Sequence, residues 1–423
     1  MADVQPLRAL HYDQAVAGPL QDLVAPPYDV IDPPARAALQ AQSPYNVVAI
    51  DLPEPPDGGD PYAAAAETLR RWIAEGAVVR DAEPAIWALV QDYTAPDGRR
   101  LTRRGLLARV RVQDYGPGRI RPHERTHPGP REDRLRLTRA TRANLSPIFS
   151  LYSDPAGAAW GAVAEHVEGD PWGEATDEDG TVHRLHRVID PTAHAAVHAA
   201  LTDAELLIAD GHHRYETARV YAEEIGGEGD HRYVLMCLVA LEDEGLTVFP
   251  THRLVRGTTP TTQEALAVAL REHFEIEPCG MEELPPPESD GPLVMGYLDA
   301  HFKKPLRLTL KSQAIADEAL AGMPEPYRRL DTAVLEALLL TGPLELTEHD
   351  IAELDGLGYA RSASDGIDLV TSGEFDLAFF LRPTPVGQVR AVAAEGVSMP
   401  PKSTYFFPKV ITGMLFNKLV QDG

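Results

Sequence analysis

The residues Asp210-Gly211-His212-His213-Arg214 place an acid, two imidazoles and a guanidinium at adjacent positions. They directly follow a short apolar run, Leu206-Leu207-Ile208-Ala209, which is typical of a buried strand. The segment 215–225 then repeats apolar side chains at helical spacing and stops at Gly226-Gly227. This pattern predicts a strand, a tight turn and a helix, with the chemically capable residues in the turn.

A turn of this kind is suited to binding anions. The free N–H groups and the dipole of the first helical turn attract negative charge, and a glycine lets a ligand approach the backbone closely. We therefore expect Gly211, His212, His213 and Arg214 to contact phosphate groups, with His213 also a candidate catalytic residue. Asp210 ends its strand, so it is predicted to hold Mg²⁺ or to transfer a proton. The alternative is that Asp210 caps the helix and the histidines are solvated.

An arginine-rich region stands out against the acidic remainder of the chain. Residues 99–142 contain 14 arginines and four acidic residues, whereas the whole sequence has 39 basic and 64 acidic residues. Segment 121–134 has almost no apolar content, which predicts a loop that closes on an anionic ligand through Arg125 and Arg134. Glu124 is the predicted general base on a substrate hydroxyl. The alternative is a solvated basic segment that pairs with acidic surface.

Metal-binding residues are few. His123 and His127 have the spacing of a helical metal pair, but Pro128-Gly129-Pro130 argues against a helix there. The two cysteines, Cys237 and Cys279, have neither a disulfide framework nor thiolate-ligand spacing. We therefore expect no zinc and no haem.

Two further segments are predicted to line a ligand site. In segment 25–31, two prolines fix an extended backbone that presents a tyrosine and an aspartate. Segment 396–403 superficially resembles a phosphate-binding P-loop, but Pro401 replaces a required glycine, so this motif is rejected. Lys402 and Lys409 could still reach a ligand; an interface edge or a buried strand is the alternative there. The predicted substrate-lining residues are Tyr28, Asp29, His123, Thr126 and Lys402.

The elements that position these residues form an α/β (α+β) fold with mixed sheets and flanking helices. Segments 85–93 and 103–112 are predicted to pair as a hairpin around the Pro96-Asp97-Gly98 turn. The apolar run 47–50 is predicted to be another strand.

A turn-rich junction suggests a division into residues 1–259, an N-terminal α/β region, and residues 260–423, a C-terminal α/β lobe.

Composition excludes several classes of protein. With 44% hydrophobic and 24% charged residues, the chain is an ordinary globular protein, and its formal net charge of −25 disfavours binding to nucleic acid or anionic membrane. Its longest apolar run, residues 233–241, is too short to cross a bilayer, and its first residues lack a leader pattern. We expect a cytoplasmic protein with a small-molecule partner and leave its oligomer state open.

Several stretches carry a resemblance to a known family, and the chain is identified through them as a member of the family called domain of unknown function 1015. The strand-turn-helix element around Asp210 also resembles the phosphate-binding turn of the ParB/sulfiredoxin superfamily, which includes nucleotide-dependent free serine kinases. This resemblance implies a ParB/sulfiredoxin-like core element, nucleotide phosphates at residues 211–214 and hydroxyl activation by Glu124. The family stretches are Ala25–Ile31, Pro44–Asn46, His123-Glu124 with Thr126, Ala209–Glu216 and Met399–Phe406.

Taken together, the residues and the resemblance predict a kinase-like phosphotransferase that uses Mg²⁺ and a nucleotide, ATP or ADP. Its predicted substrate is a small hydroxylated metabolite, with serine as one candidate. One alternative in the same site is hydrolysis of a phosphorylated metabolite. A second is a nucleotide-binding regulatory protein of the ParB type without turnover, although no helix-turn-helix pattern is evident.

Overall fold

The chain divides by its contacts into two compact units, and the last segment of unit 1 follows the whole of unit 2 in the sequence. This division differs from a single boundary between residues 259 and 260, because the C-terminal segment pairs with the N-terminal half, as in Asn417 opposite Asn144. Unit 1 comprises Met1–Pro122, Thr126–Leu246 and Pro408–Gly423; unit 2 comprises His123–Arg125 and Thr247–Phe407. The computed structural model describes residues 2–55, 58–95, 98–124, 128–284, 286–287 and 291–420.

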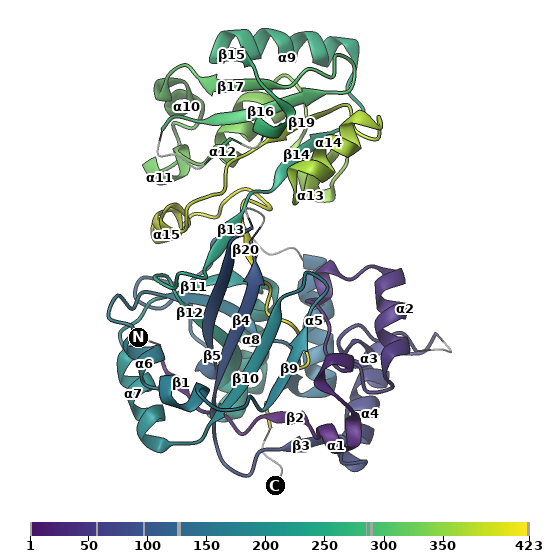
Figure 1. The fold of residues 1–423 in the computed structure, drawn as a ribbon, viewed down its shortest axis with the longest axis vertical. Coiled ribbons are helices and arrows are strands. Elements are labelled where there is room, and N and C mark those ends of the chain that lie inside the picture. Colours follow the sequence, from purple (N-terminus) through teal and green to yellow (C-terminus); the bar gives the residue numbers. More distant parts are fainter. Residues whose placement is uncertain are drawn as a thin grey trace. The chain divides into compact units, whose positions relative to one another are not determined.

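Unit 1 is built on a nine-stranded mixed sheet (Figure 1). Its central strands are almost continuously apolar: β8 is buried at every position and β12 at all but its two ends. Such strands are covered on both faces. In sheet order the strands are β6 (Ile120–Arg121), β11 (Leu206–Asp210), β8 (Ile148–Tyr152), β12 (Tyr233–Ala240), β5 (Arg100–Arg111), β4 (Ile86–Thr94), β10 (Val182–Val188) and β9 (Gly173–Thr176), with β1 (Val4–Gln5) paired to β5.

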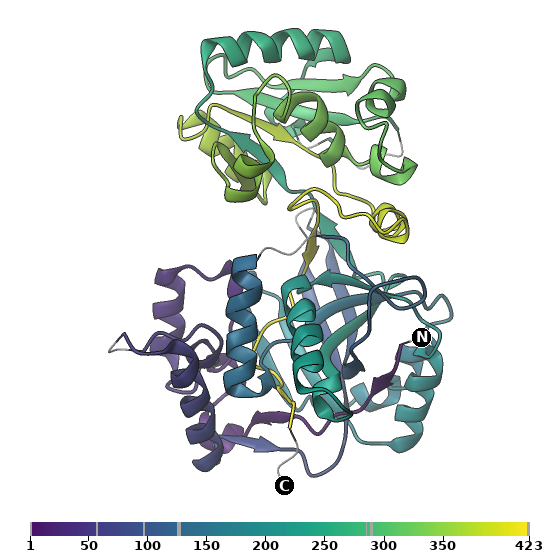
Figure 2. The same cartoon turned by 180° about the vertical axis from the view of Figure 1, so that it is seen from behind.

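Helices cover this sheet, and α5 and α8 lie side by side over one face (Figure 2). Between them Leu135 of α5 packs with Tyr221 of α8 and with Leu419 near the C-terminus. The helices of unit 1 are α1 (Gln14–Ala17), α2 (Pro33–Gln42), α3 (Val48–Asp51), α4 (Pro61–Ala74), α5 (Pro128–Thr141), α6 (Ala158–Gly161), α7 (Pro191–Leu201) and α8 (His212–Ile225). Two small strand pairs complete the unit, β2 (Leu10–Tyr12) with β3 (Val78–Arg80) and β7 (Ala143–Asn144) with β21 (Asn417–Lys418).

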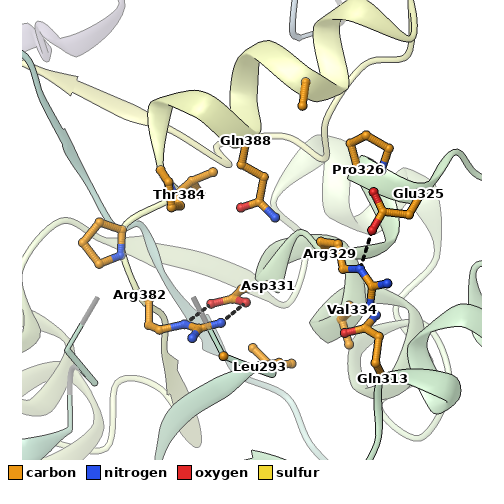
Figure 3. A pocket seen from close by; sticks show the side chains of 14 residues that line it. Leu293, Gln313, Glu325, Pro326, Arg329, Asp331, Val334, Arg382, Thr384 and Gln388 are labelled. Carbon is orange, nitrogen blue, oxygen red and sulfur yellow. Dashed lines mark hydrogen bonds and ion pairs between the residues drawn. The ribbon is translucent and has the colours of Figure 1, made fainter. Parts of the chain in front are cut away.

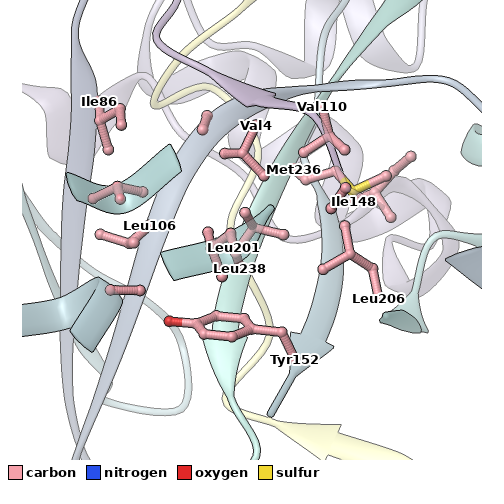
Figure 4. Close-up of a cluster of buried hydrophobic side chains, with 14 of the residues drawn as sticks. Val4, Ile86, Leu106, Val110, Ile148, Tyr152, Leu201, Leu206, Met236 and Leu238 are labelled. Atoms are coloured by element: carbon pink, nitrogen blue, oxygen red, sulfur yellow. The ribbon is translucent and has the colours of Figure 1, made fainter. Parts of the chain in front are cut away.

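The main core of unit 1 lies between the sheet and its helices (Figure 4). Val110, Met236 and Leu238 contribute from the central strands, and Leu201 from α7. Tyr215 of α8 is fully buried in the same cluster. The core therefore anchors α8, the helix that carries the predicted phosphate-binding turn.

Two local predictions are wrong, each for a physical reason. The run 47–50 is the helical turn α3, because the Asn46 side chain accepts a hydrogen bond from the Val48 N–H and favours a turn over a strand. Helix α5 begins at Pro128 despite the prolines, because the first N–H groups of a helix have no intrahelical partner. The hairpin of β4 and β5 is confirmed; positions 96–97 of its turn lie outside the described residues.

Unit 2 is a six-stranded sheet flanked by helices (Figure 1). Its sheet order is β15 (Phe274–Pro278), β17 (Leu306–Leu310), β16 (Val294–Asp299), β19 (Leu377–Phe380), β14 (His252–Val255) and β18 (Leu357–Ala360). Its helices are α9 (Pro260–His273), α10 (Gln313–Ala319), α11 (Glu325–Arg328), α12 (Asp331–Leu335), α13 (Glu348–Glu353), α14 (Ala363–Thr371) and α15 (Val386–Ala394). A separate pair joins β13 (Thr247–Phe249) to β20 (Tyr405–Phe407).

Alternation along these strands produces one apolar core on each face of the unit 2 sheet. Val255 and Phe379 belong to one cluster, whereas Leu254 and Phe380, their neighbours in sequence, belong to the other. Both units thus confirm the predicted α/β class with mixed sheets and flanking helices. Among the described residues, no helix has the length and apolar character needed to span a membrane.

Candidate phosphate-binding site

The strand, turn and helix predicted around Asp210 are present in unit 1. Strand β11 ends at Asp210, and Gly211, with φ of 98°, is the N-cap residue of α8. A side chain at this φ is strained, and a Cβ on Gly211 would lie 2.9 Å from the Nε of Arg214. The helix has no side-chain cap at this end, so its first turn keeps the positive end of its dipole available for an anion.

Asp210 is held by two cations and does not cap the helix. Lys409 Nζ donates to its Oδ1 at 2.9 Å, and Arg214 Nη2 donates to its Oδ2 at 2.7 Å. Burial alone would raise the pKa of Asp210, but Lys409 and Arg214 outweigh burial and hold that pKa well below its usual range. The carboxylate is therefore ionised at every physiological pH. It suits charge positioning or metal binding better than proton abstraction, which needs a pKa near the working pH.

Arg214 also connects the turn to the strand beside it. Its Nη1 donates to Ser146 Oγ at 3.1 Å and to the carbonyl of Pro147. Its Nε is buried and has no hydrogen-bond partner within the described part of the chain. Because a buried donor without a partner costs free energy, this N–H is a candidate contact for an oxyanion.

A second charged cluster in unit 1 is centred on Arg134 of α5. Its Nη1 donates to Asp51 Oδ1 at 3.1 Å and to the Asp51 carbonyl at 2.9 Å, and its guanidinium lies 4.2 Å from the centre of the Tyr28 ring. Its Nη2 lies 2.7 Å from Asp133 Oδ2. Burial raises the pKa of Asp51, with Arg134 and then Arg214 opposing that rise.

The two clusters are linked through Arg214. Burial raises the pKa of Tyr28 to about 12, and the charge of Arg214 is the main influence that lowers it. Tyr28 is therefore a neutral phenol at physiological pH. Among the predicted site residues, Tyr28, Arg134 and the Asp210 turn lie near one another within unit 1, whereas the neighbouring Asp29 is exposed.

A cavity of about 30 Å³ borders both Arg134 and Arg214. It is too small for a nucleotide, so a nucleotide at this turn has to bind on the solvent side of that cavity. The side chains of Lys409 and Asp210 are 17% and 20% exposed there. Buried His212 and half-buried His213 occupy the first two positions of α8.

Other predicted residues belong to unit 2. His123 is buried, with Nε2 2.9 Å from Thr404 Oγ1 and its carbonyl accepting from the Met399 N–H at 2.7 Å. Glu124 is half-buried. The family stretches 123–124 and 399–406, far apart in sequence, therefore meet within this unit.

The negative charge of Glu124 acts on Arg253, a buried residue of β14. Burial lowers the pKa of Arg253, and Glu124 is among the groups that oppose this. Arg253 donates to the carbonyls of Lys402 and Pro401, each at 3.0 Å, while the Lys402 side chain is exposed. Lys402 thus contributes its backbone to this cluster.

Three predicted residues, Arg125, Thr126 and His127, lie outside the described residues. Among the residues that are described, no group of three or more His, Cys, Asp or Glu side chains is placed to hold a metal ion. A single carboxylate can still hold Mg²⁺ when phosphates supply further ligands. Asp210 fits that role only if the ion competes with Lys409 or Arg214 for its oxygens.

The sequence marks Lys409 only as able to reach a ligand and does not single out Asp51. The available signal for Asp51 was a charged residue directly after the apolar run 47–50, in a region that folds as a helix. Its pairing with Arg134 depends on tertiary structure.

Comparison with known proteins gives a family and distant structural likenesses. The profile of the family described as "Protein of unknown function (DUF1015)" matches residues 4–333. A search among curated proteins finds no match.

Three of the solved structures similar to the chain illustrate the range. A conserved hypothetical protein from Pyrococcus furiosus is 15% identical, with 68% of this chain and 86% of that chain covered and a TM-score of 0.33. A free serine kinase in complex with AMP is 14% identical, with 68% and 83% covered and a TM-score of 0.34. A C-terminally truncated SbnI from Staphylococcus aureus is 14% identical, with 74% and 86% covered and a TM-score of 0.38.

Proposed function

We propose that this chain, which belongs to the DUF1015 family, is a phosphotransferase that binds a nucleotide at the Asp210 turn and phosphorylates a small hydroxylated metabolite. The observation that carries the proposal is the uncapped N-terminus of α8 at Gly211, with Arg214 and Lys409 beside it. The sequence resemblance of this element to the phosphate-binding turn of nucleotide-dependent kinases supports the same assignment.

The residues of the turn would carry out the electrostatic part of the reaction. Phosphoryl transfer depends mainly on positioning and on neutralising the charge of the transferred group. The first-turn N–H groups of α8, His213 and the unpartnered Nε–H of Arg214 would hold phosphate oxygens. Lys409 and Arg214 would keep Asp210 ionised and oriented.

Asp210 would hold Mg²⁺, which supplies further neutralisation of phosphate charge when bound. The low pKa of Asp210 supports this role over that of a base. Glu124 is the proposed base that accepts the proton of the substrate hydroxyl, and Tyr28, His123 and Lys402 remain proposed contacts of the substrate. Serine is the first substrate to test.

The direct test is to incubate the full-length protein and Mg²⁺ with ATP, ADP or CTP and a pool of hydroxylated metabolites that includes serine. Mass spectrometry then follows new phosphorylated products, and phosphate release is measured in parallel. A phosphorylated metabolite that depends on Asp210 and His213 supports the proposal.

Two other outcomes would replace it. Release of phosphate from phosphorylated metabolites, without transfer, would identify a phosphohydrolase. Saturable nucleotide binding without any turnover would identify a regulatory protein. An Arg70→Gln variant is the control, because Arg70 of α4 is 71% exposed and pairs only with Glu67 on the same helix.

A further inference from the structure

A larger cavity, of about 380 Å³, lies entirely within unit 2. It is bordered by α11, α12, the start of α10, and the segment that leads into α15 (Figure 3). This volume lies in the range of cavities that hold small metabolites. Leu293 and Val334 form apolar parts of its lining, and the remainder is largely polar.

A buried ion pair forms one wall of this cavity. Arg382 donates from Nε to Asp331 Oδ2 at 2.8 Å and from Nη2 to Asp331 Oδ1 at 2.7 Å. The two side chains are only 8% and 13% exposed. Because they neutralise each other in a bidentate pair, this wall is polar without carrying net charge. Removing such charges from water costs free energy that the pair regains only in part, so the polar wall is not explained by stability alone.

Opposite this pair, hydrogen-bond donors remain available. Arg329 uses Nε to bind Glu325 Oε1 at 2.7 Å, and its two Nη groups donate no hydrogen bond within the described part of the chain. The side-chain amide of Gln388, on the first turn of α15, is likewise without a partner among the described residues and points into the space between Arg329 and Asp331 (Figure 3).

The chemistry of these donors selects the ligand. A guanidinium with two adjacent free N–H groups matches the two oxygens of a carboxylate, which accepts hydrogen bonds and donates none. The Gln388 amide adds one more donor. Leu293 and Val334 offer contact to an uncharged part of the same molecule.

We propose that this cavity binds a small carboxylate metabolite, with Arg329 and Gln388 holding the carboxylate and the body of the ligand lying against Leu293 and Val334. The shared group is the carboxylate, which both hydroxy acids and amino acids carry. This site is separate from the proposed phosphate site and does not depend on it.

The test is isothermal titration of the full-length protein with L-malate, succinate, L-glutamate and L-serine at millimolar concentrations. Succinamide serves as the uncharged analogue of succinate, and inorganic sulfate tests for general anion binding. The binding variants are Arg329→Gln and Gln388→Ala. Arg390→Gln is the matched control, because Arg390 is exposed on the same helix α15 and does not line the cavity. Circular dichroism checks that each variant is folded.

We expect saturable binding of at least one carboxylate and none of succinamide. Arg329→Gln should weaken that binding by about tenfold or more, Gln388→Ala by a smaller factor, and Arg390→Gln by less than about twofold. Preference for malate or for an amino acid then identifies the source of the carboxylate. The proposal is overturned if no carboxylate binds, if sulfate binds equally well, or if both cavity variants bind as the unmodified protein does.

Discussion

Lys409 Nζ lies 2.9 Å from Asp210 Oδ1, although the two residues are 199 positions apart in the sequence. The contact joins the C-terminal segment of unit 1 to the end of β11 and, with Arg214, keeps the carboxylate ionised. The proposed phosphate site is therefore completed by a residue that follows the whole of unit 2.

Replacing Lys409 with methionine should lower the stability of unit 1 at neutral pH by about 1–3 kcal/mol, because Asp210 loses one charged partner. The pKa of Asp210 is lowered in the folded protein, so its contribution is present above its unfolded pKa of about 4 and is lost as pH falls further. The deficit should therefore shrink below about pH 4.

Tryptophan fluorescence during urea denaturation measures this, because Trp72, Trp87, Trp160 and Trp172 all lie in unit 1. Lys409→Arg, which keeps the charge, is the control. A deficit that is equal at pH 7 and pH 3 would contradict the electrostatic explanation.

Gly211→Ala should destabilise unit 1 more than Gly226→Ala. Both glycines flank α8 and have positive φ, 98° and 68°, so each substitution strains the backbone by about 1–2 kcal/mol. Only the Cβ at position 211 also meets the Arg214 guanidinium; position 226 has nothing within 4 Å. The same fluorescence measurement compares them, and equal losses would show that the close approach of Arg214 is unimportant.

Alanine at His213 or Arg214 should each weaken nucleotide binding by roughly 1–3 kcal/mol, if both make charged hydrogen bonds to phosphate. Calorimetry with ATP and ADP measures this. Arg214→Ala should also lower stability, because Arg214 holds Asp210, Ser146 and the Pro147 carbonyl. His213→Ala is therefore the cleaner variant. Glu223→Gln, at an exposed position of α8, is the control, and unchanged affinity in both alanine variants would reject the phosphate site.

Glu124→Gln should reduce turnover in the proposed reaction by roughly a hundredfold or more while leaving nucleotide affinity nearly unchanged, because the amide cannot accept the substrate proton. Single-turnover kinetics separate the two effects. The control is Glu132→Gln, since Glu132 of α5 is exposed. Full turnover in Glu124→Gln would assign proton transfer to another group.

Unit 2 should lose stability as pH falls below about 6.5, because His252 is buried in its neutral form. Burial, and then the neighbouring Arg253, lower the pKa of His252 to about 4, and its Nδ1 accepts a hydrogen bond from the Leu381 N–H. The unfolded chain binds the proton more readily, so the stability is complete above about pH 6.5 and is lost as pH falls toward 4. The maximum loss is about 3 kcal/mol.

Hydrogen exchange in strands β14 and β19 measures this effect, because unit 2 has no tryptophan in the sequence. His252→Gln should have lower stability at pH 7 and a flatter dependence between pH 7 and pH 4. A variant with the same pH dependence as the unmodified protein would assign the effect to other groups.

The sequence by itself determined the local elements. The strand, turn and helix around Gly211 and the hairpin of β4 and β5 follow from an apolar run, a glycine and regular side-chain spacing, which act over a few neighbouring residues. The same local signals were insufficient at residues 47–50, because a short apolar run fits a strand or a helix, and there the Asn46 side chain favoured the helical turn.

Tertiary structure alone decided which distant charges meet. Lys409 reaches Asp210, and Asp51 pairs with Arg134, because the C-terminal segment and α3 pack into unit 1. His123 and Thr404 meet within unit 2, although much of the sequence separates them. Such pairings depend on the order of strands in a sheet and on the path of the returning chain, and local spacing carries no record of either.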